Sequence, residues 1–342
     1  MSETLEPSPG RYLLSRYAES MFWLARYMER IENLARLLDV TETFVRTGGT
    51  SSGWLSIVQI NADVERFFAR AERADHESVV RFYVLDRENP TSIMASIAAA
   101  HENARTLRPL ISTEMWSQIN VFHRELRALT PADTTPARLS RLCDQLKQSC
   151  QTHAGITAGT LFRDQAWNFY TLGRFMERAD QTTRLVDIKY HTLLPSADDV
   201  GTAIDLSQWH ALLRAAAGYH AFRRVYPSGM TPASVAGFLL MNHSFPRSLV
   251  LCVEQLRAQL GQLRSGHGLR ATEAEEIVDD LRAALIAQSI DTVIGLGLHE
   301  FLDWVQRRLI STYGAIADAF WRAPGEADGA AGAESGQGQS QA

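Results

Sequence analysis

The chain has 342 residues, of which 45% are hydrophobic and 21% charged, a composition typical of a globular protein with a substantial core. Its formal net charge is −5, and no segment concentrates positive charge, which argues against a nucleic-acid partner. No apolar run reaches the roughly 18 residues that a membrane span needs, and no basic-then-apolar leader opens the chain, so we expect a cytoplasmic protein that does not use a membrane.

The two ends of the chain differ in composition from the rest. Residues 1–10 contain two prolines and a glycine, and residues 324–342 are small or polar without a large apolar side chain. Such segments cannot bury enough apolar surface to offset the entropy that is lost on ordering. We therefore predict that both ends are disordered.

Between the ends the pattern is helical, and it is clearest over residues 24–39. Apolar residues recur there with the spacing i, i+3, i+4 and i+7, at Leu24, Tyr27, Met28, Ile31, Leu34, Ala35 and Leu38. On a helix these residues form one stripe, and Arg26, Glu29 and Arg30 fall on the opposite side. No segment shows the sustained alternation with a period of two that strands require. We therefore predict an all-α protein.

Residues 172–187 repeat residues 24–39. Eight of the sixteen positions are identical at an offset of 148, where average residue usage gives about one. The core of the repeat is an Arg-x-x-Glu-Arg motif, present as Arg26, Glu29 and Arg30 and again as Arg174, Glu177 and Arg178.

The repetition extends beyond these two segments. Trp54 matches Trp209 at an offset of 155, Ser92 matches Ser248 at an offset of 156, and a weaker match at 159 follows near the end of each copy. The sequence thus predicts one helical unit that occurs twice, over residues 11–157 and 158–323. Because each helix has an apolar stripe that needs a cover, we expect the copies to form an internally duplicated helical bundle with pseudo-twofold symmetry.

A polar turn, Asp86-Arg87-Glu88-Asn89-Pro90, separates two predicted helices of the first copy. Pro90 suits the first turn of a helix, where its missing N–H costs nothing, and Asn89 suits the N-cap. Alternatively, Asp86 and Asn89 bring further polar groups to a site formed by the charged helices, and we include both among the candidate binding residues.

The repeated charges allow three interpretations. A solvated helix face is the simplest, since exposed pairs contribute only about 0.2–0.5 kcal/mol each. In the second, the two faces meet, and Glu29 pairs with Arg178 while Glu177 pairs with Arg30, as buried charges require. In the third, the arginines line a cleft for a carboxylate or phosphate.

The charged positions repeat more faithfully than the apolar stripe, so a merely solvated face is not the interpretation we favour. We predict a partly buried network that lines a cleft. Its candidate binding residues are Arg26, Glu29, Arg30, Arg174, Glu177 and Arg178. Glu29 and Glu177 are the candidates for an acid or base.

Other catalytic signals are weak. The ten histidines form no metal-binding pattern, and no histidine has a glutamate three residues before it, as di-iron bundles require. His299 begins a stretch that resembles a zinc-protease helix, but Asp303 stands where the second histidine belongs. The chain has no Walker loop and no Gly-x-Ser-x-Gly elbow. We therefore expect no metal and no cofactor.

Three stretches together resemble the bacterial alpha-E family. They are Arg-Tyr-Met-Glu-Arg at 26–30, Gly-Arg-Phe-Met-Glu-Arg-Ala-Asp at 173–180 and Leu-Asp-Arg-Glu-Asn-Pro-Thr-Ser-Ile at 85–93. The resemblance covers about residues 11–322 and implies a helical domain, named for its Glu-Arg motif. That motif maps here onto Glu29-Arg30 and Glu177-Arg178.

The resemblance also implies a context. Alpha-E proteins tend to be encoded beside, or fused to, a circularly permuted ATP-grasp protein and a transglutaminase-like cysteine peptidase, which suggests a system for amide ligation of peptides. We favour an accessory subunit that binds the ligase or its carboxylate-bearing peptide. The alternatives are an enzyme that uses Glu29 or Glu177 as acid or base, and a structural scaffold with internal ion pairs.

Overall fold

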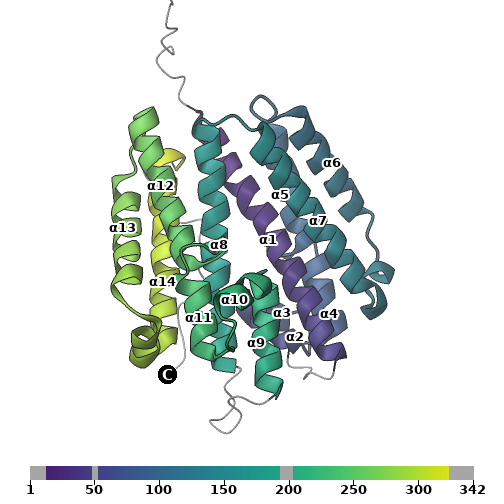
Figure 1. The fold of residues 1–342 in the computed structure, drawn as a ribbon. Helices are drawn as coiled ribbons and strands as arrows, with labels where there is room; N and C mark the ends of the chain where they lie inside the picture. The colour runs from purple at the N-terminus through teal and green to yellow at the C-terminus, as the bar shows by residue number, and fades with distance from the viewer. Residues whose placement is uncertain (1–12, 48–52, 193–202, 323–342) are drawn as a thin grey trace, which may run out of the picture.

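The computed structural model describes residues 13–47, 53–192 and 203–322, and every regular element in these ranges is a helix (Figure 1). The prediction of an all-α protein is confirmed. The two chain ends that we predict to be disordered lie outside the described residues. Within the described part of the chain, no helix is long and apolar enough to cross a membrane.

The first half of the chain, up to residue 160, begins with one long helix and continues through short elements to three further helices. In order these are α1 (Ser15–Arg46), α2 (Gly53–Ile60), α3 (Val64–Phe68), α4 (His76–Val80), the π-helical turn η1 (Arg81–Leu85), α5 (Ile93–Thr106), α6 (Thr113–Arg127), the 3-10 turn η2 (Pro131–Thr134) and α7 (Pro136–Thr160). Helix α7 runs through Gly155 and Gly159, so the connection to the second half falls at residues 161–164, slightly later than the predicted boundary after residue 157.

The second half also begins with a long helix and ends with three helices. Its elements are α8 (Gln165–Thr192), α9 (Ala203–Ala215), α10 (Tyr219–Val225), α11 (Pro232–Met241), α12 (Leu249–His267), α13 (Thr272–Ala287) and α14 (Ile290–Phe320). Helix α14 contains a kink at Gly297, whose φ of 117° is a conformation that favours glycine.

Helices α1 and α8 lie side by side in the middle of the molecule (Figure 1). Helix α1 packs against α5 and α7 on one side, and α8 packs against α12 and α14 on the other. The buried apolar side chains form one core that includes residues of both halves, such as Phe22, Trp54, Phe169 and Trp209. The α1–α8 pair therefore joins the two halves, and it carries both copies of the charged motif.

Gly173 allows the backbones of α1 and α8 to approach closely. A Cβ atom at this position would lie 2.0 Å from the carbonyl oxygen of Phe22 on α1. A backbone carbonyl within a helix cannot move aside as the end of a flexible side chain can. The spacing of the two central helices therefore depends on a residue without a side chain.

The helices that follow the two polar turns are capped by serines. Ser92 Oγ accepts a hydrogen bond from the backbone N–H of Ala95 at 3.0 Å, and Ser248 caps α12 in the same way through Leu251. The expectation that Asn89 caps this helix and that Pro90 lies in its first turn is wrong. The side chain of Asn89 is already used inside the turn, where its amide donates to the carbonyl oxygen of Phe82 at 3.0 Å.

We predict that Gly173→Ala lowers the free energy of unfolding by about 3 kcal/mol, the upper end of the usual cost of overpacking, because the added methyl group meets backbone rather than a movable side chain. Gly155→Ala in α7 is the matched control. No heavy atom lies within 4 Å of a Cβ there, so that variant should gain about 0.5–1 kcal/mol from helix propensity. Urea unfolding followed by circular dichroism measures both; equal stability of the two variants would contradict the close approach.

Candidate functional site: a buried Arg–Glu network

The two charged motifs face one another across the α1–α8 interface. Glu177 is fully buried, and Glu29 is 4% exposed. The flanking Arg26 and Arg30 are also buried, at 8% exposure each. The interpretation of these charges as a solvated helix face is therefore wrong, because α8 and its neighbours cover the face of α1 that carries them.

Two arginines of α1 hold the carboxylate of Glu177. Arg26 Nε donates to Oε2 at 2.7 Å, and Arg30 Nε donates to Oε1 at 2.7 Å. Arg30 also donates through Nη2 to Oε2 at 3.3 Å, so its guanidinium binds both oxygens. Burial alone would raise the pKa of Glu177, but Arg30 and Arg26 outweigh burial and lower the pKa to about 2.

The carboxylate of Glu29 is held differently. Arg178 Nε of α8 forms an ion pair with Oε1 of Glu29 at 2.9 Å, and Arg247 Nη1 donates to the same oxygen at 2.5 Å. Burial would raise the pKa of Glu29, but Arg178 and Arg247 lower it to about 2. The predicted cross pairs Glu29–Arg178 and Glu177–Arg30 are thus both present.

Arg247 was not among the residues that the sequence indicates. It lies in the turn before α12, and besides Glu29 it binds Oδ1 of Asn33 at 2.8 Å and Oε1 of Glu32 at 3.2 Å. The corresponding residue before the N-cap serine of α5 is Thr91. A search for repeated residues passes over this position, because the two segments differ there.

Arg174 lies one turn before Glu177, as Arg26 does before Glu29, but its contacts differ. Its Nε is buried, and no described residue accepts a hydrogen bond from it. Burial, and then the positive charge of Arg178, lower the pKa of the Arg174 guanidinium. For Arg178 burial acts in the same direction, but Glu29 outweighs it and raises the pKa.

Further ion pairs surround this centre. Arg36 binds Glu32 at 2.6 Å, and Arg184 binds Asp180 at 3.0 Å. We define the Arg–Glu network as Arg26, Arg30, Arg36, Arg174, Arg178, Arg184 and Arg247 with Glu29, Glu32, Glu177 and Asp180. These seven arginines and four carboxylates leave an excess of three positive charges.

A small pocket adjoins the network between α1, α8 and α9. Its polar lining comes from Asn33, Arg178, Gln181, Thr182 and Arg247, and its volume is about 20 Å³, which has room for about one water molecule. The amide nitrogen of Asn33 is buried there without a hydrogen-bond partner among the described residues. The cleft that we predict beside the charges is thus much narrower than a substrate-sized cavity.

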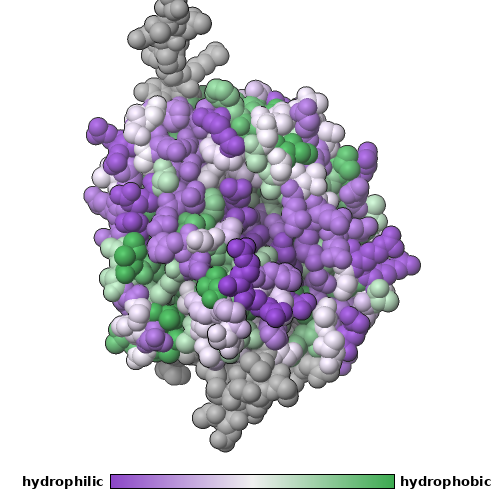
Figure 2. Space-filling view, viewed as in Figure 1, coloured by the Kyte–Doolittle hydropathy of each residue, from purple (hydrophilic) through white to green (hydrophobic). Residues whose placement is uncertain are grey.

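The outer surface over the two central helices is polar. Figure 2 shows hydrophilic side chains gathered over the middle of the face in which α8, α1 and α10 are seen. Among the described residues, no group of three or more His, Cys, Asp or Glu side chains is placed to hold a metal ion.

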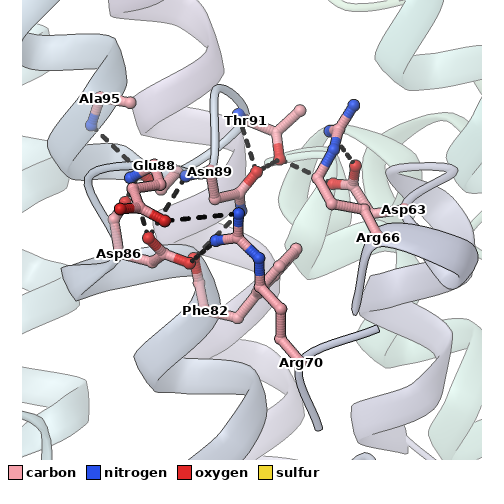
Figure 3. Close-up of polar contacts among 10 residues, drawn as sticks. Asp63, Arg66, Arg70, Phe82, Asp86, Glu88, Asn89, Thr91 and Ala95 are labelled. Carbon is pink, nitrogen blue, oxygen red and sulfur yellow. Dashed lines mark hydrogen bonds and ion pairs between the residues drawn. The ribbon is translucent and has the colours of Figure 1, made fainter. Parts of the chain in front are cut away.

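Among the described residues, Asp86 and Asn89 make their side-chain contacts with their own turn, with Phe82 and with Arg70 (Figure 3). Asp86 accepts from the backbone N–H groups of Glu88 and Asn89 and pairs with Arg70 at 2.8 Å. Asn89 is fully buried, and its side-chain oxygen accepts from the hydroxyl of Thr91 at 2.7 Å. The two residues therefore order the turn that leads into α5.

Together, the fold and the site define a class of protein: an α-helical domain whose two central helices carry buried Glu-Arg pairs. The Alpha-E family, described as a predicted alpha-helical domain with a conserved ER motif, has a model that matches residues 13–321. The chain belongs to the Alpha-E family.

Curated relatives include uncharacterized proteins of Mycobacterium bovis and Mycobacterium tuberculosis, each 26% identical over 209 residues. The match covers 59% of this chain and 22% of each relative. The matched part of this chain thus spans about a fifth of the length of those relatives. No solved structure matches this chain.

We predict that Glu177→Gln lowers the free energy of unfolding by about 3 kcal/mol, because it removes the buried negative charge that Arg26 and Arg30 both contact. Glu88→Gln is the matched control, since the Glu88 side chain is 83% exposed and only 3.6 Å from Arg70; it should cost less than about 0.5 kcal/mol. Chemical denaturation measures both. A loss below about 1 kcal/mol for Glu177→Gln would contradict a buried, paired carboxylate.

The same pairs predict how stability depends on pH. The pKa values of Glu29 and Glu177 fall from 4.5 in the unfolded chain to about 2 in the folded protein. Their contribution is therefore complete above about pH 4.5 and is lost as the pH falls toward 2. Urea unfolding between pH 6 and pH 3 should show this decline, and the decline should be shallower in Glu177→Gln. An equal slope in both proteins would contradict the lowered pKa of Glu177.

Proposed function

We propose that this chain is a non-catalytic accessory subunit of a bacterial system that makes or modifies peptides by amide ligation. Its partner is a circularly permuted ATP-grasp protein that acts together with a transglutaminase-like peptidase. In this proposal the chain binds the ligase or its carboxylate-bearing peptide through the arginines of the Arg–Glu network. The observation that carries the proposal is the excess of arginine over carboxylate in that network.

The protonation state of the two glutamates supports a binding role over the acid/base alternative. Both carboxylates are buried, and their pKa values of about 2 keep them ionised at neutral pH. A general acid needs a proton at working pH, and an effective base needs a pKa near that pH. Glu29 and Glu177 meet neither requirement, so the proposal gives them a structural role.

The scaffold alternative also has an observation in its favour. Each motif glutamate is bound by an arginine of the opposite central helix. In this alternative, the Glu-Arg motif serves to hold the two halves of the chain together. We combine the two roles: the paired charges hold α1 and α8 together, and the remaining positive charge is left for a partner.

We further propose that the two halves are duplicated copies related by a pseudo-twofold axis. Helices α5 and α12 begin at Ile93 and Leu249, which are 156 positions apart, and α6 and α13 begin at Thr113 and Thr272, which are 159 apart. These are the offsets at which the two parts of the sequence match. The reciprocal ion pairs across α1 and α8 support the same arrangement.

Two further observations support the context of the proposal. In the mycobacterial relatives the matched region is part of a chain several times longer, as expected for a domain that works beside others. Cys143, Cys150 and Cys252 are free and buried, which agrees with a reducing, cytoplasmic compartment.

We predict that the purified chain forms a complex with the ATP-grasp protein encoded in the same genome. Co-purification with a tagged ATP-grasp protein tests this in the absence of nucleotide and with ADP, ATP or a non-hydrolysable ATP analogue. A stoichiometric complex under at least one condition is expected. Absence of a complex under all of them, with both proteins folded, would contradict the proposed role.

A further inference from the structure

Arg26 and Arg174 occupy the same position in the two motifs, but only one of them is neutralised. Arg26 binds Glu177 through Nε at 2.7 Å, and its guanidinium lies 4.7 Å from the ring centroid of Trp23. Arg174 lies over Phe175 at 5.0 Å, but its buried Nε donates to no described residue. One half of the central pair thus carries a guanidinium whose buried Nε is not hydrogen-bonded to a carboxylate of the described residues.

Arg247 explains why Arg174 does not donate a hydrogen bond to Glu29, because Arg247 donates to that carboxylate instead. It sits directly before the N-cap serine of α12 and donates to Glu29 at 2.5 Å. The residue directly before the N-cap serine of α5 is Thr91, whose hydroxyl donates to Asp63 at 2.7 Å and carries no charge. Glu177 therefore binds two arginines from its partner motif, whereas Glu29 binds one from its partner motif and one from outside it.

Glu29 lies close enough to act on the charge of Arg174, but two other groups near Arg174 are neutral side chains. His153 and Tyr170 are almost fully buried, and both lie close enough for the charge of Arg174 to affect their pKa values. Burial, and then Arg174, lower the pKa of His153 to about 4. His153 is therefore neutral at pH 7, and its Nδ1 has no hydrogen-bond partner among the described residues.

We infer that Arg174 recognises a single carboxylate group of a peptide bound by this protein. The inference rests on the proposed function and names the residue and the ligand group that this function requires. A guanidinium binds a planar carboxylate through two parallel N–H donors. The protein already contains this geometry, since Arg30 binds both oxygens of Glu177 at 2.7 Å and 3.3 Å. The peptide carboxylate binds the guanidinium of Arg174 as the carboxylate of Glu177 binds the guanidinium of Arg30.

The test follows the side-chain Nε–H signal of Arg174 by 15N NMR, assigned with Arg174→Lys. The protein is titrated with acetyl-Ala-Ala-Ala, which has a free C-terminal carboxylate, and with the same peptide as its C-terminal amide. A third arm uses acetyl-Ala-Glu-Ala amide, which carries the carboxylate on a side chain. We expect a saturable shift with at least one carboxylate peptide and none with the amide.

Two variants separate Arg174 from general positive charge. Arg174→Gln should weaken binding of the carboxylate peptide at least tenfold, whereas Arg224→Gln, which removes an exposed positive charge, should leave it unchanged. Arg247→Thr introduces threonine, the residue type that the first half has at the matching position, Thr91. It should free Glu29 to bind Arg174 and weaken peptide binding at least tenfold, although Arg174 is retained.

Several results would overturn the inference. They are an equal shift with the carboxylate and amide peptides, unchanged binding by a folded Arg174→Gln, or unchanged binding by a folded Arg247→Thr. A saturable shift with inorganic phosphate and none with either carboxylate peptide would also overturn it. If the ATP-grasp complex forms while the carboxylate peptides fail, the proposed function stands and the role of Arg174 is refuted.

Discussion

The pairing of two buried carboxylates across one helix interface is the constraint on which the rest of the structure depends. An ionised carboxylate taken out of water costs several kcal/mol unless charged donors compensate it. Glu29 on α1 and Glu177 on α8 are compensated only when the two helices lie face to face in one register. Gly173 allows the close approach that this register requires. The remaining helices then cover the outer faces of the central pair.

This arrangement separates the structural role of the Glu-Arg motif from its proposed role in binding. The glutamates cannot move or exchange protons near neutral pH without breaking ion pairs that hold the two halves together. The arginines are more numerous than the carboxylates, and one of them, Arg174, is partly buried with an Nε that donates no hydrogen bond to a described residue. This arrangement supports the proposal that the site recognises an anion, since its glutamates are already held in ion pairs.

The all-helical class and the ion pairs at the centre of the site could be predicted from the sequence, because the helical period and the repeated charged residues are visible in it. The helical period of residues 24–39 predicts α1, and the repeated charges predict the cross pair between Glu29 and Arg178. The role of Asn89 could not be predicted, because whether it caps a helix or orders a turn depends on which backbone groups come near it. Arg247 lies more than 200 positions from Glu29 in the sequence, and only the packing of α12 against α8 brings it there.

The central claim is that the buried charges stabilise the protein as pairs. A double-mutant cycle with Arg30→Gln, Glu177→Gln and the double variant tests it most directly, with unfolding free energies measured at pH 7. The account predicts a coupling energy of at least about 2 kcal/mol, because each single substitution already removes the two hydrogen bonds between Arg30 and Glu177, so the second substitution cannot remove them again. Additive losses, with a coupling below about 0.5 kcal/mol, would contradict it.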